Sequence, residues 1–223
     1  MRYQVVPVRA LKDNYIWLLR DGKSAAVVDP GEAAPVLDIL AAERLELAAI
    51  LLTHHHRDHT GGVAGLLEIR RVPVLGPRGE PIEHLTRQVS EGDQVEVPEI
   101  GASFQVLDVP GHTRAHIAYY GEKTLFCGDT LFACGCGRVF EGTSEQLFQS
   151  LQKLAALPDD TRVYCARIHP GEHRICQGSG TGQRGTRRPA ARRCRSACPG
   201  AADRALDPGA RKGHQPVPAL RRA

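Results

Sequence analysis

Thr53-His54-His55-His56-Arg57-Asp58-His59-Thr60-Gly61-Gly62 is the stretch that decides how this chain is interpreted. The apolar run 47–52 before it has the length of one buried strand, and a helix is expected to follow. Four imidazoles and a carboxylate within six residues have no role in an apolar core, and together they suit zinc or another borderline divalent ion. At a strand end, His54 and His56 can converge on one ion, while Asp58 and His59 can point toward a second.

Two later segments offer further ligands and weaken the alternative of a solvated histidine-rich loop. Residues 108–113 end a strand in a tight turn that presents His112, and residues 124–130 end another strand at Asp129. A single His or Asp at a strand end is more often a hydrogen-bonded turn residue, but the cluster makes both of them candidate ligands. A purification tag is excluded, because a tag would lie at a terminus. His116, inside an apolar strand, is expected to be a hydrogen-bonded core residue.

Alternating apolar and β-branched residues, separated by turn signals, predict a sheet-rich domain. Strands are expected near residues 4–8, 15–19, 24–28, 48–52, 93–97, 103–108, 116–120, 124–127 and 162–166. Helical spacing predicts a helix within 32–44 and another that begins at Thr143 or Ser144. The second helix is expected to bury Leu147, Phe148, Leu151 and Leu154. Strands in runs with helices between them indicate a sandwich of the α/β or α+β class.

Charge and aromatic content divide the 223 residues into two parts. Residues 1–166 carry 16 Lys and Arg against 22 Asp and Glu, and they hold all eleven aromatic residues. Residues 167–223 carry 13 basic and 3 acidic residues and are rich in Gly and Pro. We therefore predict a folded catalytic domain over 1–166, followed by a disordered basic tail with too little apolar surface to offset chain entropy.

Composition also bears on location. No apolar run approaches the roughly 20 residues of a membrane span. The N-terminal residues lack the apolar segment of a signal peptide. Seven cysteines, an odd number without framework spacing, are typical of reduced thiols. These features predict a cytoplasmic protein without a membrane partner.

The order His-x-His-x-Asp-His, a later His and a later Asp resembles the signature of the metallo-β-lactamase superfamily. The segments LKDNY (11–15), FACGCGR (132–138) and VYCA (163–166) are similar to glyoxalase II, a hydroxyacylglutathione hydrolase family within it. The resemblance runs in order through 1–166 and implies an α+β fold, an αββα sandwich. It also implies one metal ion held by His54, His56 and His112, a second held by Asp58 and His59, and Asp129 as a bridge between them.

The resemblance further implies the reaction. The two divalent ions would share a hydroxide that attacks the thioester of S-D-lactoylglutathione. Zinc is the expected metal, with iron or manganese as alternatives. The products, glutathione and D-lactate, make this the second step of methylglyoxal detoxification. Arg138 stands where the family usually has a Lys or Arg that contacts glutathione. A monomer acting on this small molecule is expected.

The resemblance breaks after Ala166, where Arg167 replaces the His that completes the second metal site in the family. The family's C-terminal glutathione-binding helices are also missing, and the basic tail stands in their place. Codons read in a shifted frame permit His-Glu-Tyr-Thr at this point and a family-like ending near 211–218. We therefore expect a two-base deletion or a sequencing error after Cys165, a weakened second metal site and impaired activity.

Two other functions stay open from the sequence. A mononuclear-iron persulfide dioxygenase of the same superfamily would need only His54, His56, His112 and Asp129, although the intact pair Asp58-His59 favours the hydrolase. Nucleic-acid binding through the basic tail is the non-enzymatic alternative. No aromatic residue interleaves with the tail's arginines for base stacking, so we expect no nucleic-acid partner.

Overall fold

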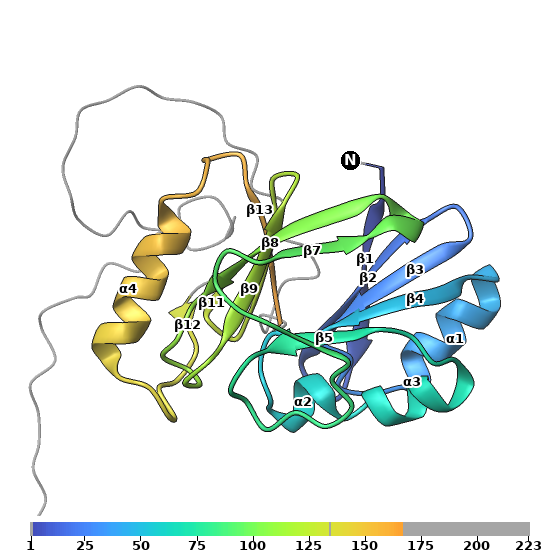
Figure 1. Ribbon diagram of the computed structural model, residues 1–223, viewed down its shortest axis with the longest axis horizontal. Coiled ribbons are helices and arrows are strands. Elements are labelled where there is room, and N and C mark those ends of the chain that lie inside the picture. Colours follow the sequence, from blue (N-terminus) through green and yellow to red (C-terminus); the bar gives the residue numbers. More distant parts are fainter. Residues whose placement is uncertain (1, 134, 167–223) are drawn as a thin grey trace, which may run out of the picture.

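Two β-sheets stacked face to face form the centre of the molecule, and helices lie on their outer sides (Figure 1). The computed structural model describes residues 2–133 and 135–166. The six-stranded sheet contains, in spatial order, β1 (Gln4–Ala10), β2 (Asn14–Asp21), β3 (Ser24–Val28), β4 (Glu46–Leu51), β5 (Val74–Pro77) and β6 (Arg87–Val89). The five-stranded sheet contains β13 (Arg162–Cys165), β10 (Thr124–Gly128), β9 (Ile117–Gly121), β8 (Ala102–Asp108) and β7 (Gln94–Val97). A short hairpin pairs β11 (Leu131–Phe132) with β12 (Gly135–Cys136).

The helices complete a four-layer arrangement. They are α1 (Ala34–Glu43), α2 (Arg57–Thr60), α3 (Val63–Ile69), the 3₁₀ turn η1 (Pro98–Ile100) and α4 (Ser144–Ala155). Apolar side chains of α1 and α3 pack on the outer face of the six-stranded sheet, and Leu154 of α4 packs on that of the five-stranded sheet. Figure 1 shows α4 on one side of the stacked sheets and α1 with α3 on the other. The predicted αββα order is confirmed. None of the helices in the described residues is long and apolar enough to cross a membrane.

The burial of each strand follows from the layers on its two sides. β3 and β4 lie between helices and the other sheet, so their apolar runs are nearly continuous, as in strands covered on both faces. In β7 buried and exposed residues alternate strictly, because only one face of this strand packs against the core. Pro7 lies in β1, at the edge of its sheet, where a missing amide donor is tolerated.

Aromatic side chains fill much of the space between the sheets. Phe104 of β8 is fully buried and packs edge-on against Tyr119 of β9 and Phe126 of β10. Each of these rings contributes roughly 1.5–3 kcal/mol through the apolar surface it removes from water. The Tyr119 hydroxyl donates to the carbonyls of Leu52 and Leu75 at 3.0 and 3.2 Å. The second sheet is thereby attached to β4 next to the histidine cluster.

The structure corrects the predicted face of α4. The helix begins as expected at Thr143, whose side chain forms a capping box with Gln146. Leu147 and Leu154 are buried, but Phe148 is 56% exposed, and the buried position beside them is Ser150. The Ser150 hydroxyl donates to the carbonyl of Pro110 at 2.7 Å, so this face of the helix rests on the turn that precedes His112.

Four strands were not predicted. β5 and β6 contain four and three residues, and β11 and β12 contain two each, which is too short for an alternation to be recognised. The pairing of β5 and β6 with neighbouring strands, all parallel, extends the first sheet beyond β4. The predicted basic tail, 167–223, lies outside the described residues.

Candidate metal centre

Strands of both sheets end at one edge of the sandwich, and the site residues follow directly after them. His54, His56, Asp58 and His59 come after β4, His112 after β8 and Asp129 after β10. The amide of Ile117 donates to the carbonyl of Thr53 at 3.0 Å, which joins the edges of the two sheets. Gly128, with φ +49°, lets β10 turn close to Thr53, since a Cβ there would lie 2.3 Å from the Thr53 hydroxyl oxygen.

His54, His56 and His112, here called the histidine group, direct ring nitrogens at one another. His56 Nδ1 lies 3.2 Å from His54 Nε2 and 3.1 Å from His112 Nε2. Burial, together with neighbouring imidazoles, holds the pKa of His54 well below its ordinary value, and burial and His112 lower the pKa of His56. Both rings are therefore neutral near pH 7 and offer lone pairs.

Hydrogen bonds on the far side of two rings determine which nitrogen carries the proton. The Thr53 hydroxyl donates to Asp29 Oδ2 at 2.7 Å, so its oxygen is available to accept from His54 Nδ1 at 3.1 Å. His112 Nδ1 donates to the carbonyl of Arg138 at 2.7 Å. These contacts place the outer nitrogens of His54 and His112 against oxygen atoms, while the Nε2 atoms of both rings face His56 Nδ1. Such outer contacts are typical of metal-binding histidines.

Asp58, His59 and Asp129, here called the mixed group, lie beside the first. His59 is buried, and its Nε2 lies 3.3 Å from Asp129 Oδ1 and 3.6 Å from Asp58 Oδ2. Its Nδ1 is 3.0 Å from Asp29 Oδ2, although neither ring nitrogen makes an aligned hydrogen bond among the described residues. Burial lowers the pKa of His59, but the Asp29 and Asp129 carboxylates outweigh it and raise this pKa to about 10.

Asp129 lies between the two groups. One carboxylate oxygen faces His59, and the other lies 3.5 Å from His112 Nε2. The Asp129 amide donates to Nε2 of His116 at 3.2 Å, and His116 Nδ1 lies 3.3 Å from the Thr130 hydroxyl. Burial, reinforced by His112, lowers the pKa of His116 to about 3. The prediction that His116 is a hydrogen-bonded core residue is confirmed.

The donor set fits divalent ions of the borderline class. The histidine group gathers three imidazole nitrogens within 4.8 Å of one another, and His54, His59 and Asp129 form a second such set. In the first set, His56 Nδ1 faces the Nε2 atoms of both His54 and His112, and three imidazoles at this spacing suit a divalent cation. In the mixed group, where carboxylates raise the pKa of His59, Asp58 and Asp129 supply the negative charge and oxygen ligands that suit a divalent ion.

A cavity of about 640 Å³ opens onto both groups. Its lining includes His56, His112 and Asp129 on one side, and Arg138 and Phe140 on another. Phe140 is 62% exposed and stands edge-on to His56 and His112, with ring centroids 5.6 and 5.2 Å away. Arg138, predicted to bind substrate, is thus placed at the cavity that leads to the ligand groups.

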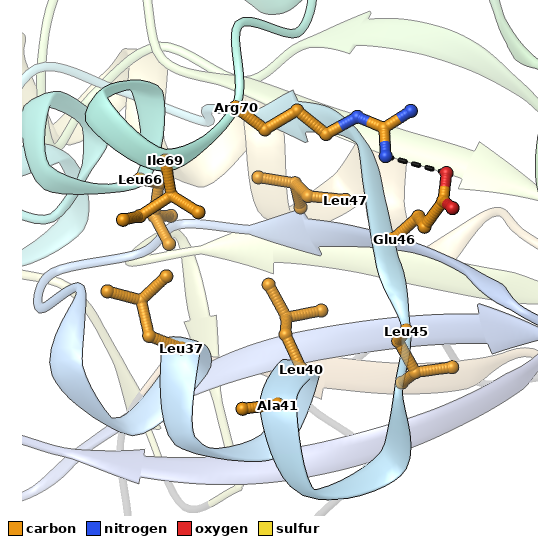
Figure 2. A pocket seen from close by; sticks show the side chains of 9 residues that line it. All are labelled: Leu37, Leu40, Ala41, Leu45, Glu46, Leu47, Leu66, Ile69 and Arg70. Carbon is orange, nitrogen blue, oxygen red and sulfur yellow. Dashed lines mark hydrogen bonds and ion pairs between the residues drawn. The ribbon is translucent and has the colours of Figure 1, made fainter.

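A second hollow, of about 480 Å³, lies away from this centre between α1 and α3 (Figure 2). Figure 2 shows that leucine, isoleucine and alanine side chains line it, with one ion pair between Arg70 and Glu46 at 2.6 Å. Among the described residues, its lining includes no imidazole and no cysteine.

Three residues near the ligands were missed as parts of the site. Asp29 contacts His59 and Thr53, and the sequence Asp-Pro-Gly that it begins is typical of a turn after a strand. Asn14 donates to Asp58 Oδ2 at 3.1 Å, and the buried Glu80 contacts His55. Asn14 lies in the segment LKDNY that carries the family resemblance, although no role was predicted for it, and nothing in the local sequence marks Glu80. Arg167, expected in the place of a final ligand, lies outside the described residues.

Comparison with known proteins agrees with the fold and the motif. Residues 11–167 match the Metallo-beta-lactamase superfamily. The hydroxyacylglutathione hydrolase of Nitrosomonas eutropha is 56% identical over 162 residues, which cover 73% of this chain and 64% of that protein. The corresponding enzyme of Cupriavidus metallidurans is 57% identical over 175 residues, covering 73% and 66%. This chain thus spans slightly less than two thirds of the length of these relatives.

Solved structures show the same architecture. ETHE1 from Myxococcus xanthus is 32% identical, with a TM-score of 0.66 and coverage of 77% of this chain and 78% of that one. TTHA1623 in a di-iron-bound form is 31% identical, with a TM-score of 0.61 and coverage of 74% and 91%.

Proposed function

This chain belongs to the metallo-beta-lactamase superfamily, and we propose that within it the protein hydrolyses the thioester S-D-lactoylglutathione to glutathione and D-lactate. The observation that carries the proposal is the position of Asp129 between two complementary ligand groups, next to a cavity lined by Arg138. The names of the curated relatives, 54–58% identical across this region, support the same activity.

We propose that His54, His56 and His112 hold one divalent ion, that Asp58 and His59 hold a second, and that Asp129 is shared. Such ions supply Lewis acidity and make water acidic enough to act as a nucleophile near neutral pH. Zinc is the expected metal, with iron or manganese as alternatives, and the di-iron form of TTHA1623 supports a site for two ions.

The remaining roles belong to side chains of this chain. Thr53 and the Arg138 carbonyl keep protons on the outer nitrogens of His54 and His112, so the inner nitrogens stay available. The Arg138 guanidinium can pair with a carboxylate of glutathione. The leaving thiolate has an ordinary thiol pKa near 8.5, so its departure needs no strong acid. Neither a serine nor a cysteine nucleophile is required.

We further propose that the second ion is held weakly in this chain, because Arg167 stands where the family has its last ligand. Loss of the family's C-terminal helices would raise KM by removing contacts to glutathione, and a poorly held second ion would lower kcat. A cytoplasmic location, a monomeric state and the absence of a nucleic-acid partner stay predictions from the sequence.

The test compares three proteins: the chain as it is, Arg167→His, and the chain translated after two bases are restored behind Cys165. Hydrolysis of S-D-lactoylglutathione is followed together with metal content. We expect the chain as it is to hydrolyse the thioester slowly and with a high KM. Arg167→His should recover binding of the second ion with little change in KM, and the chain with two restored bases should recover both metal binding and hydrolysis.

Two outcomes would change this interpretation. If the unrepaired chain matches the repaired one, residues 167–223 substitute for the family's helices and the frameshift hypothesis is wrong. If the repaired chain binds one iron and consumes oxygen with a glutathione persulfide while leaving the thioester intact, the protein is the dioxygenase instead.

A further inference from the structure

Glu80 is a buried carboxylate that belongs to neither ligand group. It follows β5 in the connection to β6, and only 2% of its side chain is exposed. A carboxylate removed from water is costly unless hydrogen-bond donors surround it. The donors that surround Glu80 therefore indicate what it does.

Glu80 receives four donors, two on each oxygen. Oε2 accepts from the backbone amide of His55 at 2.6 Å and lies 2.8 Å from Nδ1 of the His55 ring. Oε1 accepts from the hydroxyl of Thr113 and from the amide of Ala115 at 3.2 Å. The partners are 25 to 35 residues away in the sequence, so packing alone brings them to this side chain.

These donors come from the two loops that carry the histidine group. His55 stands between His54 and His56, and Thr113 directly follows His112. The first loop continues from β4 of one sheet, whereas the second leaves β8 of the other. The backbone bond from Ile117 to Thr53 joins the loops at their base, and Glu80 joins them beside the ligands themselves.

Each ring nitrogen of His55 lies next to a carboxylate. Its Nδ1 is occupied by Glu80, and its Nε2 lies 3.1 Å from Glu141 Oε1. The middle one of three consecutive histidines is therefore held between two carboxylates, while its neighbours in the sequence face His112.

We propose that Glu80 is a positioning residue of the metal centre, which bridges His55 and Thr113 and thereby sets the distance of His54 and His56 from His112. The proposal rests on the proposed function, because it assumes that the histidine group holds an ion. Glu80 itself touches neither the ion nor the substrate.

The test measures zinc affinity in the full chain by competition with a chromophoric chelator, together with the visible spectrum after loading with cobalt. Glu80→Gln keeps the size of the side chain, but its amide must direct an NH₂ group at donors that need an acceptor. We expect zinc binding to weaken about 10- to 100-fold, the range for outer contacts of metal ligands, and the cobalt spectrum to change. Glu80→Asp, which keeps the charge, should recover part of the affinity.

Glu83→Gln is the matched control, because Glu83 lies three residues further along the same segment with 94% of its side chain exposed. It should bind zinc like the unaltered chain. Thr113→Val removes one donor at nearly constant volume and should weaken zinc binding in the same direction, which covers the case in which Glu80→Gln does not fold. Thermal unfolding of the metal-free proteins shows whether a variant is merely less stable.

The outcomes separate the two proposals. If Glu80→Gln binds zinc as tightly as Glu83→Gln and its cobalt spectrum is unchanged, Glu80 is only a structural residue and the inference is wrong. If Glu80→Gln does not fold, the same result with Thr113→Val leads to the same conclusion. If the unaltered chain and its repaired form bind zinc but leave the thioester intact, the proposed function fails and the positioning role stands. If the unaltered chain binds no zinc, both are wrong.

Discussion

The histidine group and the mixed group lie side by side, but the chain supports them differently. His54 and His112 are buried and each is oriented by a hydrogen bond on its outer nitrogen, and the two loops that carry the group are bridged by Glu80. In the mixed group, Asp58 belongs to the four-residue helix α2, keeps 28% of its side chain exposed, and receives a bond from Asn14.

This difference shows that ligand type alone does not decide how well an ion is held. Both groups draw residues from loops of the two sheets, but only in the histidine group does Glu80 bridge the two loops. Asp58 lies in a short helix and keeps part of its side chain exposed, and we propose that Arg167 stands in the place of the family's last ligand. The two groups are therefore expected to differ in affinity, and five substitutions test that expectation.

Asp129→Asn should have the largest effect, since Asp129 faces both groups. Replacing the shared carboxylate by an amide removes its charge and one of its two acceptor oxygens. We expect retained zinc to fall to near zero after gel filtration, and kcat/KM for the thioester to fall by more than the roughly 100-fold limit for outer residues. Elemental analysis that still finds a tightly held ion would contradict a shared role.

His56→Ala and Asp58→Ala should separate the groups. The first change removes the nitrogen that faces both His54 and His112, so the tightly held ion should be lost. The second should leave about one tightly bound zinc per chain and abolish only the weaker binding. Zinc titration of both variants under the same conditions checks this, and equal losses from the two would mean that the groups bind as one unit.

Thr53→Val should weaken the histidine group without removing a ligand. The substitution keeps the volume but deletes the hydroxyl between Asp29 and His54. We expect zinc affinity to fall about 10-fold and the free energy of unfolding to fall by about 1–3 kcal/mol, because a buried acceptor loses its donor. Thr60→Val, which removes contacts only to the backbone carbonyls of His55 and His56, should change zinc affinity less.

Asn14→Ala should have the smallest effect, confined to the second ion. The change removes the amide that donates to Asp58. One hydrogen bond has a net value of about 0.5–1.5 kcal/mol, so binding of the weaker ion should fall about 2- to 10-fold while the tight ion is unaffected. A loss of the tight ion on titration would show that β2 supports both groups.

The candidate ligands could be proposed from the sequence because the cluster of His54, His56, Asp58 and His59 follows an apolar strand. A single His or Asp at a strand end is more often a turn residue, so this cluster was what made His112 and Asp129 candidates. The short strands β5 and β6 could not be found in this way, because they are recognisable only through pairing with their neighbours. The predicted face of α4 wrongly included Phe148, because the helix instead rests on Pro110 through the hydroxyl of Ser150.

By itself, the amino-acid sequence determined a sheet-based sandwich and the imidazoles and carboxylates that follow its strands, since hydrophobic periodicity and residue type are local properties. The αββα order of the layers was implied by the family resemblance. Only the tertiary structure decided which groups orient those atoms. Asp29, 24 residues before Thr53, and Glu80, 25 residues after His55, are carboxylates without any local pattern. Their partners are selected by the packing of two sheets, because a buried carboxylate must find its donors wherever the chain places them.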